Sequence, residues 1–199
     1  MTRIWISKVN DAAIEPVLDR PSANPKLKAA IADLLRESAD RFIVPRFRNL
    51  QSQDIATKTS DTDFVTIADQ QAEAWLAPKL SVLQPGFVIG EEAASLTPAI
   101  RDHIPLGYGW TIDPLDGTKN FVKGKPAFCS MVALLWNGQP VQSWIWQPLT
   151  QTLFYAAEGQ GAVRIDKNGA SNLRLKDRSD DVDLMFGSGN SLGLIEPQK

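Results

Sequence analysis

The sequence predicts an α/β protein with a layered α+β architecture, in which two N-terminal helices pack on a mostly antiparallel sheet. Apolar residues recur at spacings of three and four in residues 24–50 and 66–82, as in amphipathic helices. From residue 108 onward, short apolar runs alternate with turn-forming residues, as in a β meander. Because the helices precede most of the strands, the order favours a layered domain over a regular βαβ array.

The first helix is predicted to begin at Asn24 and Pro25, since Asn is a good N-cap and Pro suits the first helical position. Pro45 is expected to kink or end this helix. The second helix is predicted over residues 66–82. Residues 1–23 have no clear period, so we interpret them as a leader.

The strand predictions come from short apolar runs bounded by turn signals, and Asn137-Gly138 is the strongest hairpin signal. Residues 87–89 are expected to form a short buried strand, and Cys129 to be a small buried strand residue. The predicted strands are, in chain order, residues 87–89, 108–112, 128–136, 141–146, 153–157, 162–165, 173–175 and 182–186.

Composition narrows the function classes. The chain has 199 residues, of which 43% are hydrophobic and 22% charged, as in ordinary globular proteins. The net charge of −2 gives no electrostatic support for a nucleic-acid partner or an acidic membrane surface. Residues 1–10 lack the apolar core of a secretory signal, and no apolar run is long enough to span a bilayer. We therefore expect a cytoplasmic protein.

The densest cluster of reactive groups is residues 113–118 (Asp-Pro-Leu-Asp-Gly-Thr), which follow the strand predicted at 108–112. A proline turn can aim the carboxylates of Asp113 and Asp116 at one point. Mg²⁺ prefers such oxygens, together with water and substrate phosphate. The main-chain carbonyl of Leu115 is a further oxygen ligand. This pattern predicts a divalent-metal site.

Gly117 lets the main chain approach a ligand closely, and a helix beginning near Thr118 would offer N–H groups to a phosphate. The local pattern is equally consistent with a plain hairpin loop whose carboxylates are solvated. Upstream, Glu91 follows a short apolar strand, where catalytic acids often occur, although an exposed glutamate pair is the simpler explanation. Thr66 and Asp69 have the spacing of a capping box.

Together these segments resemble the inositol monophosphatase family, whose members are Mg²⁺-dependent, lithium-sensitive phosphatases of the sugar-phosphatase superfamily. Residues 110–121 (Trp-Thr-Ile-Asp-Pro-Leu-Asp-Gly-Thr-Lys-Asn-Phe) resemble the family signature. Residues 90–92 resemble its upstream acidic pair, and residues 63–69 a segment ending in a catalytic-site aspartate. Lys58 falls where the family carries a lysine. The resemblance runs from about residue 27 to about residue 190.

The resemblance implies a set of metal ligands and a hydrolytic mechanism. Glu91, Asp113 and the Leu115 carbonyl would hold one Mg²⁺, and Asp113 and Asp116 a second; intact family members use two or three ions. Glu91 would also be a catalytic residue, because the ion that it holds would help to activate the attacking water. A metal-activated water would attack phosphorus in line, without a phosphoenzyme.

The resemblance also implies the residues that handle water and phosphate. Asp69 and Thr118 would orient or deprotonate the attacking water, and the amides of Gly117 and Thr118 would bind the phosphate. Lys58 and Lys119 are further candidate site residues. The substrate would be a small phosphorylated alcohol such as inositol monophosphate. Bisphosphate nucleotidases often have Lys followed by Glu at this position, whereas Asn120 follows Lys119 here, so the motif does not decide the substrate. Bisphosphate nucleotidases therefore remain an alternative, as do histidinol-phosphate phosphatases of the same superfamily.

The family completes its second metal site with an aspartate in a Trp-Asp motif, which this sequence lacks. We therefore interpret residues 24–185 as an N-terminal phosphatase domain and residues 186–199 as the start of a second αβ domain that is largely missing. The expectation is weak or absent activity for this chain, and an inactive or binding-only fragment is the alternative. Family members usually dimerise, so a homodimer is an expected assembly.

A rival phosphatase interpretation rests on residues 61–65 (Asp-Thr-Asp-Phe-Val), which match the Asp-x-Asp-x-Val pattern of haloacid-dehalogenase-type phosphatases. In that chemistry Asp61 would be the nucleophile at the end of a buried apolar strand. Residues 56–60 (Ala-Thr-Lys-Thr-Ser) are not such a strand, so the structural context argues against it.

Overall fold

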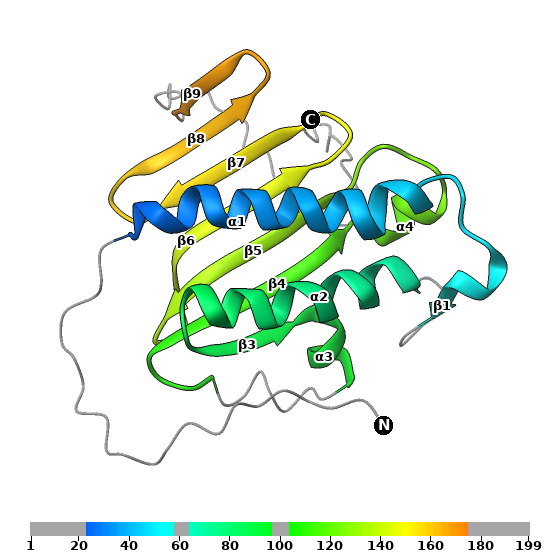
Figure 1. Ribbon diagram of the computed structural model, residues 1–199, viewed down its shortest axis with the longest axis horizontal. Coiled ribbons are helices and arrows are strands. Elements are labelled where there is room, and N and C mark those ends of the chain that lie inside the picture. Colours follow the sequence, from blue (N-terminus) through cyan, green and yellow to red (C-terminus); the bar gives the residue numbers. More distant parts are fainter. Residues whose placement is uncertain (1–22, 58–63, 97–103, 175–199) are drawn as a thin grey trace, which may run out of the picture.

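Two long helices lie across one face of a seven-stranded sheet in the computed structural model, which describes residues 23–57, 64–96 and 104–174 (Figure 1). The strand order is β3-β4-β5-β6-β7-β8-β9, so strands adjacent in sequence are adjacent in the sheet. Only β3 and β4 run parallel among these neighbours. The predicted α/β class, two helices on a mostly antiparallel sheet, is confirmed. The strands are β3 Phe87–Gly90, β4 Tyr108–Asp116, β5 Cys129–Trp136, β6 Gln139–Gln147, β7 Thr152–Ala157, β8 Gly161–Asp166 and β9 Gly169–Leu173.

Helix α1 (Pro25–Ser38) begins as its sequence predicts. Asn24 Oδ1 accepts a hydrogen bond from Lys26 N at 3.0 Å, and Pro25 takes the first helical position. A π-helical turn (Ala39–Ile43) and a 3-10 turn (Val44–Arg46) continue the helix. The chain then becomes extended at Phe47, two residues after Pro45, which confirms that Pro45 ends the helix.

Helix α2 (Ile67–Leu83) is capped by Thr66, as the capping-box spacing predicts. It packs mainly against β4, whereas α1 packs on β6. The buried face of α2 consists of Ala68, Asp69, Ala72, Leu76 and Leu80. A short two-stranded sheet, β1 (Ile55–Thr57) with β2 (Phe64–Thr66), leads into α2. None of the helices in the described residues is long and apolar enough to cross a membrane.

Three strand predictions need correction or lie outside the described residues. Residues 87–89 are half-buried rather than buried, because β3 is at the edge of the sheet. The strand expected at 173–175 starts earlier: β9 (Gly169–Leu173) begins directly after Asn168, because a tight turn returns the chain at once to pair with β8, and residue 175 lies outside the described residues. The predicted strand at 182–186 lies outside the described residues.

A buried glutamine attaches the start of α1 to the sheet. Gln142 on β6 is 1% exposed, and its Oε1 accepts a hydrogen bond from Asn24 N at 2.9 Å. Its Nε2 donates to Asn24 O at 3.1 Å and to the Tyr155 hydroxyl at 2.8 Å. Because both amide hydrogens and the carbonyl are used, this polar side chain is satisfied within an otherwise apolar core.

We expect Gln142→Leu to lower the free energy of unfolding by about 3 kcal/mol, since it leaves the Asn24 main chain and the Tyr155 hydroxyl without their buried partner. Gln139→Leu, the same change at an exposed position of β6, is the control and should shift stability by less than about 0.5 kcal/mol. Urea unfolding measures both. Equal stability of the two variants would contradict the anchoring role.

Candidate active site

The ends of the two parallel strands bring acidic residues together. In the register of β3 with β4, Gly90 lies opposite Ile112, so the next residues, Glu91 and Asp113, emerge side by side. Glu91 begins helix α3 (Glu91–Leu96) directly, which places this carboxylate at a strand-to-helix junction rather than in an exposed loop. The topology thus joins two acidic segments that lie about 20 residues apart in the sequence.

The Asp-Pro-Leu-Asp segment is a bulge within β4, which corrects the expected proline turn. Asp113 pairs with Met131 and Asp116 with Cys129, so three steps along β4 match two steps along β5. The buried Ser130 hydroxyl donates to Pro114 O at 2.7 Å. Asp113 Oδ1 accepts from Leu115 N at 3.2 Å. The bulge therefore re-aims the carboxylates of Asp113 and Asp116 without leaving the sheet.

Gly117 makes the sharp change from strand to helix. Its φ is 86°, a left-handed conformation, and it caps helix α4 (Thr118–Val122), which confirms a helix start at Thr118. A Cβ at Gly117 would lie 2.8 Å from Ala127 O, closer than such atoms approach. Conformation and space therefore both require glycine here.

Thr118 contacts the start of α2 through Asp69. Thr118 Oγ1 lies 3.0 Å from Asp69 Oδ1 and 2.9 Å from Leu115 O, and its single hydrogen can be donated to either acceptor. Asp69 Oδ2 accepts hydrogen bonds from the main-chain N and the hydroxyl of Thr66. Asp69 is 1% exposed, and its burial raises its pKa even though these hydrogen bonds act to lower it.

The carboxylates at the end of β4 repel one another. Burial raises the pKa of Asp113 to about 8, with the Glu91 charge, a hydrogen bond to Glu91 and the Asp116 charge acting in the same direction. Two carboxyl groups this close need either a shared proton or a bound cation between them, because two bare carboxylates repel each other. Carboxylate oxygens beside a main-chain carbonyl and a hydroxyl are a donor set that suits a hard cation such as Mg²⁺.

Among residues 23–57, 64–96 and 104–174, no three histidine, cysteine or acidic side chains are arranged to hold one metal ion between them. A cation bound here would therefore depend on a carboxylate pair, main-chain oxygen, water and the phosphate of a substrate. That mixture is the usual environment of Mg²⁺, which keeps several waters and uses one or two carboxylates. The residues present fit this ion.

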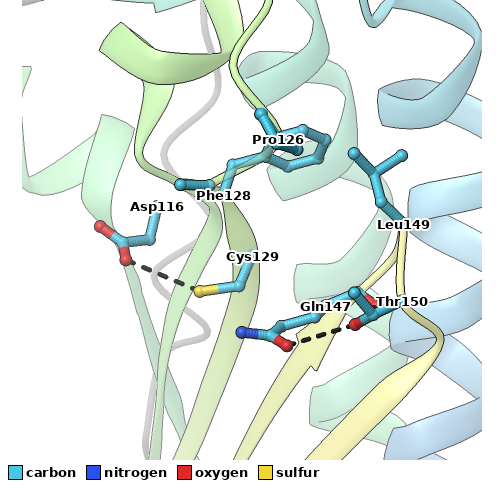
Figure 2. A pocket seen from close by; sticks show the side chains of 8 residues that line it. Asp116, Pro126, Phe128, Cys129, Gln147, Leu149 and Thr150 are labelled. Atoms are coloured by element: carbon cyan, nitrogen blue, oxygen red, sulfur yellow. Dashed lines mark hydrogen bonds between the residues drawn. The ribbon is translucent and has the colours of Figure 1, made fainter.

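Cys129 is half-buried next to the bulge, which corrects its expected burial (Figure 2). Its Sγ donates to Asp116 Oδ2 at 3.6 Å, and burial with the neighbouring Asp116 and Asp113 charges raises the thiol pKa to about 12. The thiol therefore stays protonated. Both residues line a cavity of about 300 Å³, whose other described lining residues are Pro126, Ala127, Phe128, Gln147, Leu149 and Thr150.

The structure brings together Asp69, Glu91 and residues 113–118, but not every candidate. Lys119 is exposed on α4, and Lys58 lies outside the described residues, as does Asp61 of the rival interpretation. The strand that precedes Asp61 in the described residues, β1, belongs to the small two-stranded sheet, so it is not the buried strand that the rival chemistry needs. Sequence reasoning missed Ser130, which shows no signal beyond its place in a strand. It also missed Glu73, four residues after Asp69 on α2.

Solved structures share this fold. The structure of a Thermotoga maritima IMPase superposes with a TM-score of 0.62 and 27% identity, covering 76% of this chain and 54% of that chain. An IMPase/NADP phosphatase solved with Mg²⁺ and phosphate superposes with a TM-score of 0.57 and 25% identity, covering 70% of this chain and 50% of that chain. The chain therefore has the phosphatase fold of these proteins.

Relatives identify the family. The model of the inositol monophosphatase family matches residues 24–188. The Nus factor SuhB of Xylella fastidiosa is 30% identical over 175 residues, covering 87% of this chain and 57% of that protein. A histidinol-phosphatase of Mycobacterium tuberculosis is 38% identical over 133 residues, covering 66% of this chain and 48% of that protein. The chain belongs to the inositol monophosphatase family and spans about half the length of these relatives.

We expect Asp113→Asn to stabilise the metal-free protein near pH 8, by roughly 1–3 kcal/mol, because asparagine can donate to Glu91 and accept from Leu115 N without a charge. The folded-state pKa of Asp113 lies above its ordinary 3.8. The wild type therefore loses stability relative to the variant as pH rises from about 4 to about 8.

Thermal unfolding in EDTA across this pH range measures the difference. Asp33→Asn, on the exposed side of α1, is the control and should show no such pH-dependent gain. A variant less stable than the wild type near pH 8 would contradict the repulsion at Asp113.

Proposed function

We propose that this protein contributes to the Mg²⁺-dependent hydrolysis of a phosphomonoester of a small alcohol, with an inositol monophosphate as the first candidate substrate. The observation that carries the proposal is the meeting of the Glu91–Asp113 pair with the Thr118–Asp69 pair at one end of β4. The family match over residues 24–188 supports it. In this proposal residues 24–185 form the phosphatase domain. A cytoplasmic location and a homodimer belong to the same proposal.

The metal-binding part of the proposal uses oxygen atoms of the bulge and of α3. Glu91, Asp113 and the Leu115 carbonyl would hold one ion, and Asp113 with Asp116 would contribute to a second. When bound, Mg²⁺ would neutralise phosphate charge and make water more acidic. The solved IMPase/NADP phosphatase contains Mg²⁺ and phosphate, which supports this choice of ion.

The proton-handling part uses Thr118 and Asp69. When Thr118 donates its hydrogen to Asp69 Oδ1, an oxygen lone pair remains to accept a hydrogen from an attacking water. The burial of Asp69 raises its pKa, which makes the carboxylate a better proton acceptor. Asp69 thereby orients the hydroxyl and receives its proton. The only histidine of the sequence, His103, lies outside the described residues.

The phosphate would bind at the start of α4. Gly117 has no side chain to cover its own amide, and Thr118 follows it at the first position of the helix. Main-chain N–H groups at such a start attract an anion. None of the described residues that line the nearby cavity has a basic side chain, so the main chain is the better phosphate donor set among the residues that the structure describes.

The histidinol-phosphatase relative supports a second candidate substrate of the same reaction class. The bisphosphate nucleotidase alternative rests only on Lys119. Initial rates with inositol 1-phosphate, histidinol phosphate and a nucleotide bisphosphate separate the three. Bound Mg²⁺ without hydrolysis of any of them would instead support the binding-only alternative.

We expect Mg²⁺ to raise the thermal stability of the wild type, and Glu91→Gln or Asp113→Asn to weaken Mg²⁺ binding by about 10-fold or more. Asp113→Asn should thus stabilise the protein in EDTA yet lose the stabilisation by Mg²⁺. Calorimetric titration and thermal unfolding measure both effects, with Asp33→Asn as the control. Unchanged Mg²⁺ affinity in Glu91→Gln and Asp113→Asn would rule out this site.

We expect Thr118→Val to lower the rate of phosphate release by about 100-fold, because valine keeps the shape but removes the hydroxyl that contacts Asp69. Thr118→Ser retains the hydroxyl and is the matched control. Asp69→Asn combined with Thr118→Val should cost little more than either change alone, since the two residues act as a unit. Full activity of Thr118→Val would contradict the proton path.

A further inference from the structure

A further carboxylate of the region, Glu73, holds the start of α3. Glu73 projects from α2, and its two oxygens each accept one main-chain hydrogen bond: Oε2 from Glu92 N at 2.9 Å and Oε1 from Ala93 N at 3.2 Å. These are amides of the first turn of α3, which a helix cannot satisfy internally. A charged carboxylate is a strong acceptor for such amides.

Gly90 provides the space for this contact. A Cβ at Gly90 would lie 2.0 Å from the Glu73 carboxyl carbon and 2.2 and 2.3 Å from its two oxygens. The φ of Gly90 is not positive, so alanine is compatible with its main chain. The requirement for glycine here is the room that it leaves for Glu73, not its conformation.

Asp69 and Glu73 are separated by one turn of α2, so they project from the same side of that helix. Asp69 accepts the hydrogen bond from Thr118 at the start of α4, and Glu73 accepts those from the start of α3. One rigid helix therefore fixes both Asp69, which in the proposed function orients Thr118 toward the attacking water, and the segment that carries Glu91.

We propose that Glu73 is a positioning residue, which holds the first turn of α3 so that Glu91 faces Asp113 as one half of a cation-binding pair, and that Gly90 serves this contact. The inference rests on the proposed function as far as the cation is concerned. The hydrogen bonds by which Glu73 holds α3 do not depend on that function, and their loss can be measured without metal.

Glu73→Ala and Gly90→Ala should produce the same defect by different routes. Each is expected to speed hydrogen exchange at the Glu92 and Ala93 amides by about 10-fold or more, measured by NMR without metal. Each should also weaken Mg²⁺ binding by about 10-fold, measured by calorimetry. Because Gly90→Ala keeps the Glu73 charge, weaker binding in that variant cannot come from a lost negative charge.

The double variant Glu73→Ala, Gly90→Ala should be no worse than Glu73→Ala alone, since the carboxylate that the new methyl group displaces is already gone. Glu73→Gln should be intermediate, because one of its two terminal atoms is an acceptor. Ala77→Gly removes a partly buried methyl group of α2 and weakens the helix by at least about 1 kcal/mol, so it is the control for general destabilisation and should leave both measurements unchanged.

The outcomes separate this inference from the proposed function. Unchanged exchange in Glu73→Ala, or independent effects of Glu73→Ala and Gly90→Ala, would overturn the hold on α3. Faster exchange with unchanged Mg²⁺ affinity would overturn the positioning role and leave a structural cap. A wild type that binds no Mg²⁺ would overturn the proposed function and the cation part of the inference, while the exchange result still decides whether Glu73 holds α3.

Discussion

The hydrogen bond between Thr118 and Asp69 joins segments 49 residues apart, and the rest of the site depends on it. Asp69 is 1% exposed, so water cannot replace a lost partner at its carboxylate. Its other oxygen is already occupied by Thr66, which also caps α2. The start of α2, the bulge of β4 and the start of α4 consequently form one unit, and displacement of Thr118 leaves the buried Asp69 Oδ1 without its donor.

This unit stands beside an electrostatic arrangement that does not favour folding. Glu91, Asp113 and Asp116 lie close enough that burial and mutual repulsion raise the Asp113 pKa to about 8. A protein selected only for stability would replace one of them with a neutral group of similar shape. Keeping all three carboxylates lowers the stability of the metal-free protein, and a bound cation would restore it. Such trade-offs are typical of functional sites.

The helices were predictable because local chemistry determines them. Asn24 and Thr66 cap their helices through short-range contacts, and Pro45 acts through its own ring. The hairpin at Asn137-Gly138 was predictable for the same reason. The bulge in β4 was not, because it depends on the register with β5 and on the buried Ser130 hydroxyl. The half-buried state of β3 and the early start of β9 likewise depend on pairing across the sheet.

The sequence predicted which residue types the candidate site would contain, but it did not predict their geometry. The spacing of residues 113–118 indicated a metal site and a helix start, and the resemblance added Asp69 and Glu91. Nothing in the sequence showed that Gly90 and Gly117 have different physical roles. Gly117 has a left-handed main chain and lies against Ala127 O, so any side chain there is strained. Gly90 has an ordinary main chain, and only the carboxylate of Glu73 excludes a side chain. A glycine that a local conformation requires can be inferred from a turn pattern, whereas one required by a distant side chain becomes visible only when the two elements are packed together.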